Sequence, residues 1–288
     1  MFIASAFLVS MSFITHSETT FLADLEVTEA TWIGGTVRVS SLTIYSDAAV
    51  YATDDLTIIS DGPINIQGRL VGRDGDYLNR NAGMIRLISA GEIVISGELT
   101  VGRGAQGELP GESGGAGGDL HLEAPRILLG FDSVAAGDGA SGGPGADGGN
   151  GGTIIVIGAI AQTDFGQVAL YGGTPGIGGD GVNDFGFQFR RGGNGGHGGS
   201  AMQFHNRQDA VDWRIELPVV GSLLRDGPTG SPGADGAPVG PCERGNPGTS
   251  GGNAAGSSGA AGGNGANGYV LGGVCHAGET GGNGGKGW

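Results

Sequence analysis

The stretch Gly151-Gly152-Thr153-Ile154-Ile155-Val156-Ile157 joins a glycine-rich tract directly to an apolar run of mostly β-branched residues. The same pattern recurs at Gly83-Met84-Ile85, at Gly118-Asp119-Leu120 and at Gly199-Ser200-Ala201, and a shorter version stands at Gly268-Tyr269-Val270. Counted from the glycine that directly precedes each strand, the four longer segments begin at Gly83, Gly118, Gly152 and Gly199, which are 35, 34 and 47 residues apart. Near-constant spacing that then lengthens is typical of a repeated structural unit with insertions of variable size, as in solenoid proteins.

Within one unit the predicted strands are short. The alternating apolar pattern predicts strands over residues 84–90, 92–96 and 98–101, with Gly91 and Gly97 at the corners between them. One coil would then take about twenty residues and turn through three faces, with alternate Ile, Leu and Val side chains inside. The next coil repeats this pattern over residues 119–124, 126–130 and 132–136.

The N-terminal part shows the same pattern without long insertions. We expect strands there over residues 36–39, 42–45, 56–59 and 64–66. The predicted fold is therefore all-β, a parallel β-solenoid (β-helix) with glycine-rich insertions. An antiparallel β-sandwich also uses many short strands, but its hairpins would not place the same glycine triplets at one point of every repeat.

The glycine tracts have a period of three. Glycines fall at 139, 142, 145, 148 and 151, then at 173, 176 and 179, and again at 192, 195 and 198. Three residues per turn is the period of the polyproline II helix, in which the position facing a close neighbour admits only glycine. We therefore expect Gly145 to face a neighbour and Ala146 to occupy a tolerant position.

The tracts contain two triplet runs on either side of a turn. One pair is residues 104–107 and 111–117 across Leu109-Pro110, and another is residues 173–179 and 192–198. This pattern predicts out-and-back polyproline II hairpins that stack into a side bundle, because each coil would launch its hairpin from the same corner. A collagen triple helix is excluded since the phase breaks and each tract returns to a strand. The alternative is flexible glycine linkers, although such linkers are not usually periodic.

Composition limits the function classes. The chain has 288 residues, 66 of them Gly and 11 Pro, with a net charge of −15 and a single lysine, Lys286. Nucleic acid is an unsuitable partner, because phosphate neutralisation needs a clustered basic face. No stretch outside the N-terminus approaches the roughly 18 to 20 apolar residues of a membrane span, so none is expected.

Both ends of the chain carry specific expectations. Residues 1–17 are apolar and suggest a secretory signal peptide, or an N-terminal cap of the solenoid. Residues 18–101 would form the N-terminal coils, residues 102–225 the coils with glycine-rich hairpins, and residues 226–288 a C-terminal polyproline II bundle. Cys242 and Cys275 are the only cysteines, and in an oxidising compartment we expect them to form a disulfide.

Candidate catalytic and metal sites are weak. Arg73, Asp74 and Asp76 form the best charged group, but Asp and Gly are expected in a turn for backbone reasons. Residues 142–147 begin like a repeat-in-toxin calcium motif, yet Gly149 stands where that motif needs an apolar residue. Calcium stays an alternative, no other cofactor is expected, and the five histidines show no ligand spacing. We predict that the chain is not an enzyme.

One segment has the composition of a recognition site. Phe185, Phe187 and Phe189 alternate with Gly and Gln and are followed by Arg190 and Arg191. An exposed hairpin end with this sequence would present aromatic rings beside positive charge, the residue types that dominate binding hot spots. The alternative is that the rings pack on a neighbouring hairpin or on the edge of the solenoid.

The region from about residue 23 to residue 204 resembles the glycine-rich parallel β-helix regions of bacterial secreted and surface proteins. Its tracts are similar to the polyglycine II bundles of phage tail-fibre tip adhesins and of glycine-rich antifreeze proteins. These resemblances imply an extracellular or cell-surface location and a structural or adhesive role, including assembly into fibres or matrix. The implied partners are a cell-surface receptor, a glycan or copies of the chain itself. A phage-type receptor-binding tip and an ice-binding protein are the alternatives.

Overall fold

The computed structural model describes residues 19–20, 23–130, 134–162, 169–174, 176–179, 182–183, 189–190, 194–199, 201–204, 207, 223–225, 269–271 and 274–276. Every element whose bounds are described is a β-strand, and the single described residue 207 is helical. The predicted leader or cap over residues 1–17 lies outside them. The described part of the chain includes no helix that is long and apolar enough to cross a membrane.

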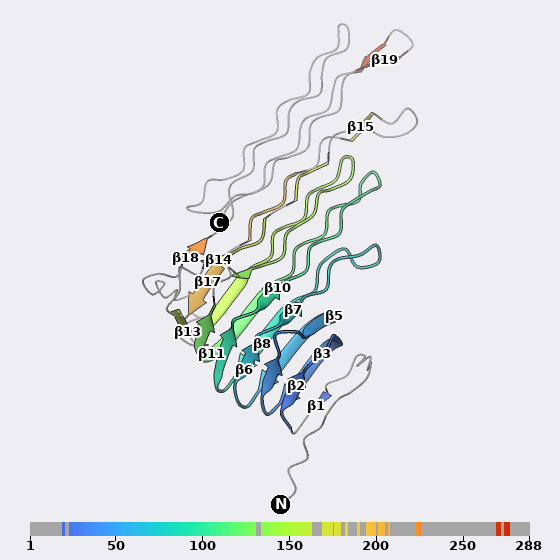
Figure 1. The fold of residues 1–288 in the computed structure, drawn as a ribbon. Coiled ribbons are helices and arrows are strands. Elements are labelled where there is room, and N and C mark those ends of the chain that lie inside the picture. The colour runs from blue at the N-terminus through green and yellow to red at the C-terminus, as the bar shows by residue number, and fades with distance from the viewer. Residues whose placement is uncertain are drawn as a thin grey trace, which may run out of the picture.

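Sixteen of the described strands form one sheet with parallel pairings, an arrangement consistent with a β-solenoid (Figure 1). The pairings divide the strands into three faces, A, B and C. Face A contains β1 (Thr19–Thr20), the second halves of β3 (Thr31–Val39) and β5 (Ala49–Ser60), β8 (Ile85–Ser89), the first halves of β11 (Leu120–Leu129) and β13 (Ile154–Gln162), and β17 (Ala201–Phe204).

The other two faces are built in the same way. Face B contains β2 (Leu25–Val27), β4 (Leu42–Ile44), β6 (Ile64–Ile66), β9 (Glu92–Ile95) and the second halves of β11 and β13. Face C contains the first halves of β3 and β5, β7 (Arg69–Val71), β10 (Glu98–Thr100), β12 (Val134–Ala135), β14 (Ala169–Tyr171) and β18 (Leu223–Arg225). Parallel pairing excludes the β-sandwich alternative for these strands.

The register of face A confirms the repeat lengths expected from the sequence. Ile85 pairs with Leu120, Leu120 with Ile154, and Ile154 with Ala201, which reproduces the intervals of 35, 34 and 47 residues. In the N-terminal coils, where no long insertion occurs, Gly35 pairs with Leu56, so one coil takes about twenty residues.

Inward-facing aliphatic side chains form the core between the three faces. Each face contributes vertical rows of Ile, Leu and Val whose exposure is close to zero; examples are Leu56, Ile85, Leu120 and Ile154 from face A, Ile64 and Ile93 from face B, and Leu70 from face C. The stacking removes the apolar surface that a single coil could not bury alone. The predicted corners hold as well, since a Cβ on Gly97 would lie 2.0 Å from the Gly68 carbonyl oxygen.

Within the described residues, glycine-rich loops connect face C to face A in four successive coils, beginning with the third (Figure 1). Loop 1 comprises residues 72–83, loop 2 residues 102–118 and loop 3 residues 137–152; loop 4 is described at residues 172–174, 176–179 and 194–199. Each loop has an outgoing arm that leaves face C and a returning arm that enters face A. In the two preceding coils β3 and β5 cross the same corner without an insertion.

Backbone hydrogen bonds join the arms at three-residue intervals. Between loops 3 and 2, the N–H groups of Gly137, Ala140 and Gly143 donate to the carbonyl oxygens of Gly118, Gly115 and Glu112, in that order, at 2.8–2.9 Å. Within loop 3, Gly152 and Gly149 donate to Gly137 and Ala140. The backbone polar groups of these arms are therefore paired with other arms, as buried backbone requires.

The expectation that Gly145 faces a neighbouring arm is wrong. Gly145 has a φ of +68° and forms the turn that separates the two arms of loop 3, as Gly111, with a φ of +83°, does in loop 2. Ala146, which we expected at a tolerant position, is buried. The run of glycines at intervals of three thus crosses a turn, and Gly145 is needed there for its left-handed backbone conformation.

Candidate functional site: the ends of the glycine loops

Most of the predicted aromatic site lies outside the described residues. Phe185, Phe187 and Arg191 are not described. Phe189 and Arg190 form β16 (Phe189–Arg190), which pairs antiparallel with β15 (Val182–Asn183). The backbones of Phe189 and Arg190 therefore belong to the stem of an antiparallel ladder, and residues 184–188 connect its two strands.

The disulfide prediction cannot be followed to both partners, because Cys242 lies outside the described residues. Cys275 lies in β20 (Val274–His276), which pairs antiparallel with β19 (Tyr269–Leu271), and its partner in the register is Val270.

The ends of loops 1 and 2 carry exposed apolar side chains that the sequence analysis did not single out. Tyr77 and Leu78 at the end of loop 1 are 83% and 88% exposed, and Leu109 at the end of loop 2 is 61% exposed. Folded domains leave few large apolar side chains this exposed in one place unless the surface binds something. The available sequence signal was an aromatic and two leucines inside otherwise polar turns.

The conformation of the loop 1 end is set by Asp76. Its Oδ1 accepts hydrogen bonds from the backbone N–H groups of Leu78 at 2.8 Å and Asn79 at 2.7 Å. The bonds from Asn79 and then Leu78 hold the pKa of Asp76 below its usual value. An aspartate that caps its own turn in this way directs the chain back and leaves the intervening side chains facing solvent.

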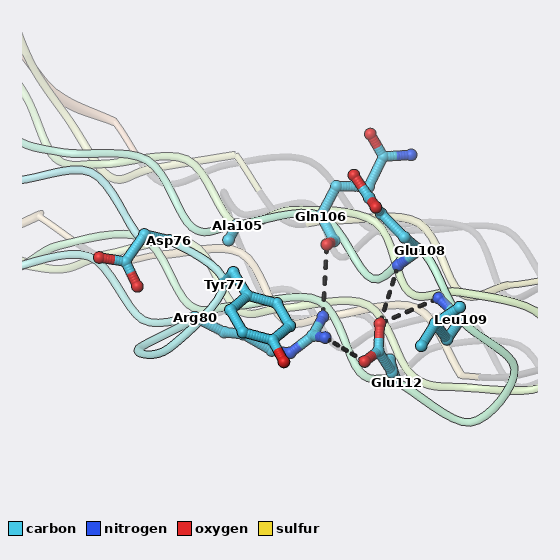
Figure 2. Close-up of a pocket in the computed structure, with 8 residues that line it drawn as sticks. All are labelled: Asp76, Tyr77, Arg80, Ala105, Gln106, Glu108, Leu109 and Glu112. Atoms are coloured by element: carbon cyan, nitrogen blue, oxygen red, sulfur yellow. Dashed lines mark hydrogen bonds and ion pairs between the residues drawn. The ribbon is translucent and has the colours of Figure 1, made fainter.

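Glu112 fixes the end of loop 2 in a similar manner. Its Oε2 accepts the backbone N–H groups of Leu109 at 2.9 Å and Glu108 at 3.2 Å, and its Oε1 lies 2.6 Å from Arg80 Nη2. The bond from Leu109, followed by that from Arg80, lowers the pKa of Glu112. The Arg80–Glu112 ion pair therefore ties the end of loop 1 to the end of loop 2 (Figure 2).

A hollow of about 260 Å³ lies between these two loop ends; Figure 2 shows the residues that line it. Three carboxylates, one guanidinium and two large apolar side chains line it, in the set Asp76, Tyr77, Arg80, Ala105, Gln106, Glu108, Leu109 and Glu112. Since Arg80 and Glu112 neutralise each other, the remaining carboxylates leave the hollow acidic. An open surface with an aromatic ring and several hydrogen-bonding groups is suited to recognition.

The charged group considered for catalysis has its polar atoms engaged with the backbone. Asp74 Oδ1 accepts the N–H of Arg103 at 2.7 Å, while Arg73 donates to the carbonyl oxygens of Asp74 and Asn81 at 2.9 Å each. In the segment that resembles the start of a calcium motif, Asp147 Oδ1 accepts the N–H of Asn194 at 2.7 Å. The described residues contain no cluster of three or more His, Cys, Asp or Glu that could hold a metal ion.

A second polar cluster lies on the outer surface of face A. His121 Nε2 is 3.4 Å from Glu123 Oε2, and Arg207 forms an ion pair with Glu123 Oε1. Burial lowers the pKa of His121, with Arg86 acting in the same direction and Glu123 opposing it. Glu123 and Arg207 also line an open depression of about 470 Å³ at the corner between faces A and B.

No protein-family model matches the chain, and neither a curated protein nor a solved structure matches it significantly.

Proposed function

We propose that this chain is a secreted or surface-displayed structural and adhesive protein, without catalytic activity, that binds through the ends of its glycine loops. The observation that carries the proposal is the exposure of Tyr77, Leu78 and Leu109 at the ends of loops whose backbones are bonded to one another. Because the loop backbones are held in this way, binding need not order the backbone that carries these apolar groups, which favours affinity.

At the level of the fold, we propose a parallel β-solenoid whose loops form a polyproline II-type side bundle. The three-residue interval between inter-arm hydrogen bonds supports this, since it is the repeat of the polyproline II helix. Such a bundle displays the loop ends at a distance from the solenoid core, where a partner can reach several of them at once.

The location and the partners follow from the same proposal. An extracellular or cell-surface location agrees with the resemblance to secreted glycine-rich β-helix proteins. The partner would be a receptor, a glycan or another copy of the chain, and the acidic hollow favours a neutral or basic ligand over an acidic one.

The test is binding to two defined surfaces, a glycan array and a layer of the immobilised chain itself. We expect the triple variant Tyr77→Ser, Leu78→Ser and Leu109→Ser to lose most of the signal seen with the wild type. The matched control is Tyr45→Ser, which removes a partly exposed aromatic side chain (38%) from the strand region and should leave binding unchanged.

Binding that persists in the triple variant would place recognition elsewhere on the chain, and absence of wild-type binding to both surfaces would count against adhesion. An ice-binding role is not favoured by the outer surface of the outgoing arms, where Asp74, Arg103 and Asp138 occupy successive layers, because that role needs a weakly charged face.

A further inference from the structure

The glycine loops stack on one another, and each loop forms one layer of the stack. Arg73 and Arg80 in loop 1 occupy two positions at which the layers above have only glycine. The first row contains Arg73 in loop 1 and Gly102, Gly137 and Gly173 in loops 2 to 4; a Cβ on these glycines would lie 1.8–1.9 Å from the carbonyl oxygen of the layer below. The second row contains Arg80, Gly115, Gly149 and Gly196, with corresponding distances of 1.7–2.0 Å. A side chain is therefore tolerated in these rows only where the layer below is missing.

Loop 1 is the lowest layer among the described residues, where lower means toward the N-terminal coils (Figure 1). The coil that precedes it crosses the same corner within β5 (Ala49–Ser60) and contributes no glycine arm. The side of loop 1 that faces the N-terminal coils thus forms an edge of the hydrogen-bonded arms. The same side of loop 2 belongs to this edge wherever loop 2 projects beyond loop 1.

The layers above loop 1 show which groups such an edge leaves open. At one position of each arm, the carbonyl oxygen accepts an N–H group of the layer below at 2.7–2.9 Å. On the outgoing arms, the N–H groups of Gly75, Gly104 and Gly139 donate to the carbonyl oxygens of Arg103, Asp138 and Thr174, in that order. On the returning arms, the N–H groups of Ala82, Gly117 and Gly151 donate to those of Ala116, Asn150 and His197. In loop 1 the equivalent residues are Asp74 and Asn81, because their Oδ1 atoms accept the N–H groups of Arg103 and Ala116.

Arg73 supplies the donors that a lower layer would have supplied. Its Nη1 donates to the carbonyl oxygen of Asp74 and its Nη2 to that of Asn81, both at 2.9 Å. One planar guanidinium therefore bridges the outgoing and returning arms of the lowest loop. The fork geometry of arginine suits two parallel acceptors, whereas lysine is a point donor.

Arg80 does the same for the projecting end of loop 2. Loop 1 turns one triplet earlier than loop 2, since the N–H groups of its turn residues are directed to Asp76. The next acceptors in register, Gln106 O and Ser113 O, consequently have no N–H below them. Arg80 Nη1 donates to both, at 3.3 and 3.4 Å. Figure 2 shows its bond to Gln106 O and the ion pair of Nη2 with Glu112.

We propose that Arg73 and Arg80 are caps that close the lower edge of the glycine arms against the addition of another glycine-rich arm, and that the arm they exclude comes from a second copy of this chain. Loops 1 to 3 show that arms of this chain can donate N–H groups to the next layer at the spacing that the edge accepts. Addition of one copy to the edge of another is a head-to-tail contact that does not close, so uncapped chains would form open assemblies.

The experiment compares sedimentation of the wild type with that of the double variant Arg73→Ala, Arg80→Ala over a range of concentrations. We expect the weight-average mass of the double variant to rise about two-fold or more relative to the wild type as concentration increases. The matched control is Arg103→Ala, which removes an exposed arginine one layer higher. The carbonyl oxygen of residue 103 already accepts the N–H group of Gly75, so this variant leaves no carbonyl oxygen without a donor.

Hydrogen exchange separates capping from a merely structural role. Because the edge offers carbonyl oxygens and the incoming arm supplies the N–H groups, we expect new protection of amides outside loops 1 to 3 in the associated double variant, with unchanged protection of loop 3. Association that accompanies loss of protection in loop 3 would indicate unfolding and overturn the proposal, as would a double variant that sediments like the wild type at every concentration. Arg73→Lys, which keeps the charge but not the fork, should associate to an intermediate extent; full suppression of association by lysine would contradict the bridging role.

Discussion

Moving one methyl group by one residue in loop 2 should separate backbone packing from composition. We compare Gly115→Ala with Ala116→Gly, two neighbouring residues of the same arm. A Cβ on Gly115 would lie 1.7 Å from the carbonyl oxygen of Arg80 and 2.8 Å from the N of Ala105. Carbon–oxygen contacts between backbones are normally about 3.3 Å or longer, so the arms must separate by more than about 1 Å.

The cost follows from the bonds that such a movement breaks. Three backbone hydrogen bonds meet at this point: Gly115 to Ala105, Ala140 to Gly115 and Ala105 to Arg80, all at 2.8–2.9 Å. At about 1 kcal/mol each they contribute roughly 3 kcal/mol. Overpacking adds about 1–3 kcal/mol, and the stiffer unfolded chain returns up to about 1 kcal/mol. The net loss should be on the order of 4 kcal/mol.

The control variant Ala116→Gly retains the hydrogen bond from the N–H group of residue 116 to Asn81 Oδ1. Its free energy of unfolding should fall by no more than about 1 kcal/mol, because glycine adds conformational freedom to the unfolded chain. Thermal melting should place Gly115→Ala on the order of 10 °C below Ala116→Gly. Hydrogen exchange should show the loss of protection concentrated in loops 2 and 3. Equal melting temperatures for the two variants would refute close backbone packing of the arms.

Three further outcomes follow from the contacts of single side chains. Asn150→Ala removes the acceptor of the His197 N–H at 2.8 Å and should cost about 1 kcal/mol, seen as faster exchange in residues 194–199, whereas Asn150→Asp should not. The pKa values of Asp76 and Glu112 are lowered in the folded state, so the two carboxylates stabilise the fold fully above their unfolded pKa values of 3.8 and 4.5. This stabilisation is lost as the pH falls below those values, and amide exchange at the ends of loops 1 and 2 should accelerate in that acidic range. The lowered pKa of His121 means that the unfolded chain binds a proton first, so stability should fall as the pH drops below 6.5; His121→Gln should flatten this part of a melting-temperature profile.

The register of face A was predictable because one physical requirement repeats. After each glycine tract the chain must return to the same face with an apolar side chain pointing inward, so Leu120 follows Ile85 at a spacing that the sequence itself displays. The corners at Gly91 and Gly97 were predictable for a similar reason, since a Cβ there would meet backbone atoms of the previous coil.

The binding surface was harder to predict, because exposure depends on where each loop turns. Tyr77 and Leu109 belong to short polar turns that contain no repeated motif. Their exposure follows from Asp76 and Glu112 folding each turn back on itself, and an acidic residue in a turn looks the same in sequence whether it only caps the backbone or also shapes a surface. The aromatic segment that the sequence predicted as a binding site has its centre, Phe187, outside the described residues.

The period of three alone does not tell which glycines are crowded. In a returning arm two of every three positions face other arms: a Cβ on Gly148 would lie 2.1 Å from the Gly176 oxygen, and a Cβ on Gly149 1.9 Å from the Gly115 oxygen. Only the third position, that of Asn150, points outward. The informative pattern is therefore Gly-Gly-x. Residues 148–153 and 195–200 keep this pattern. Residues 79–84, where loop 1 returns to face A, do not, which agrees with the place of loop 1 at the lower edge of the arms.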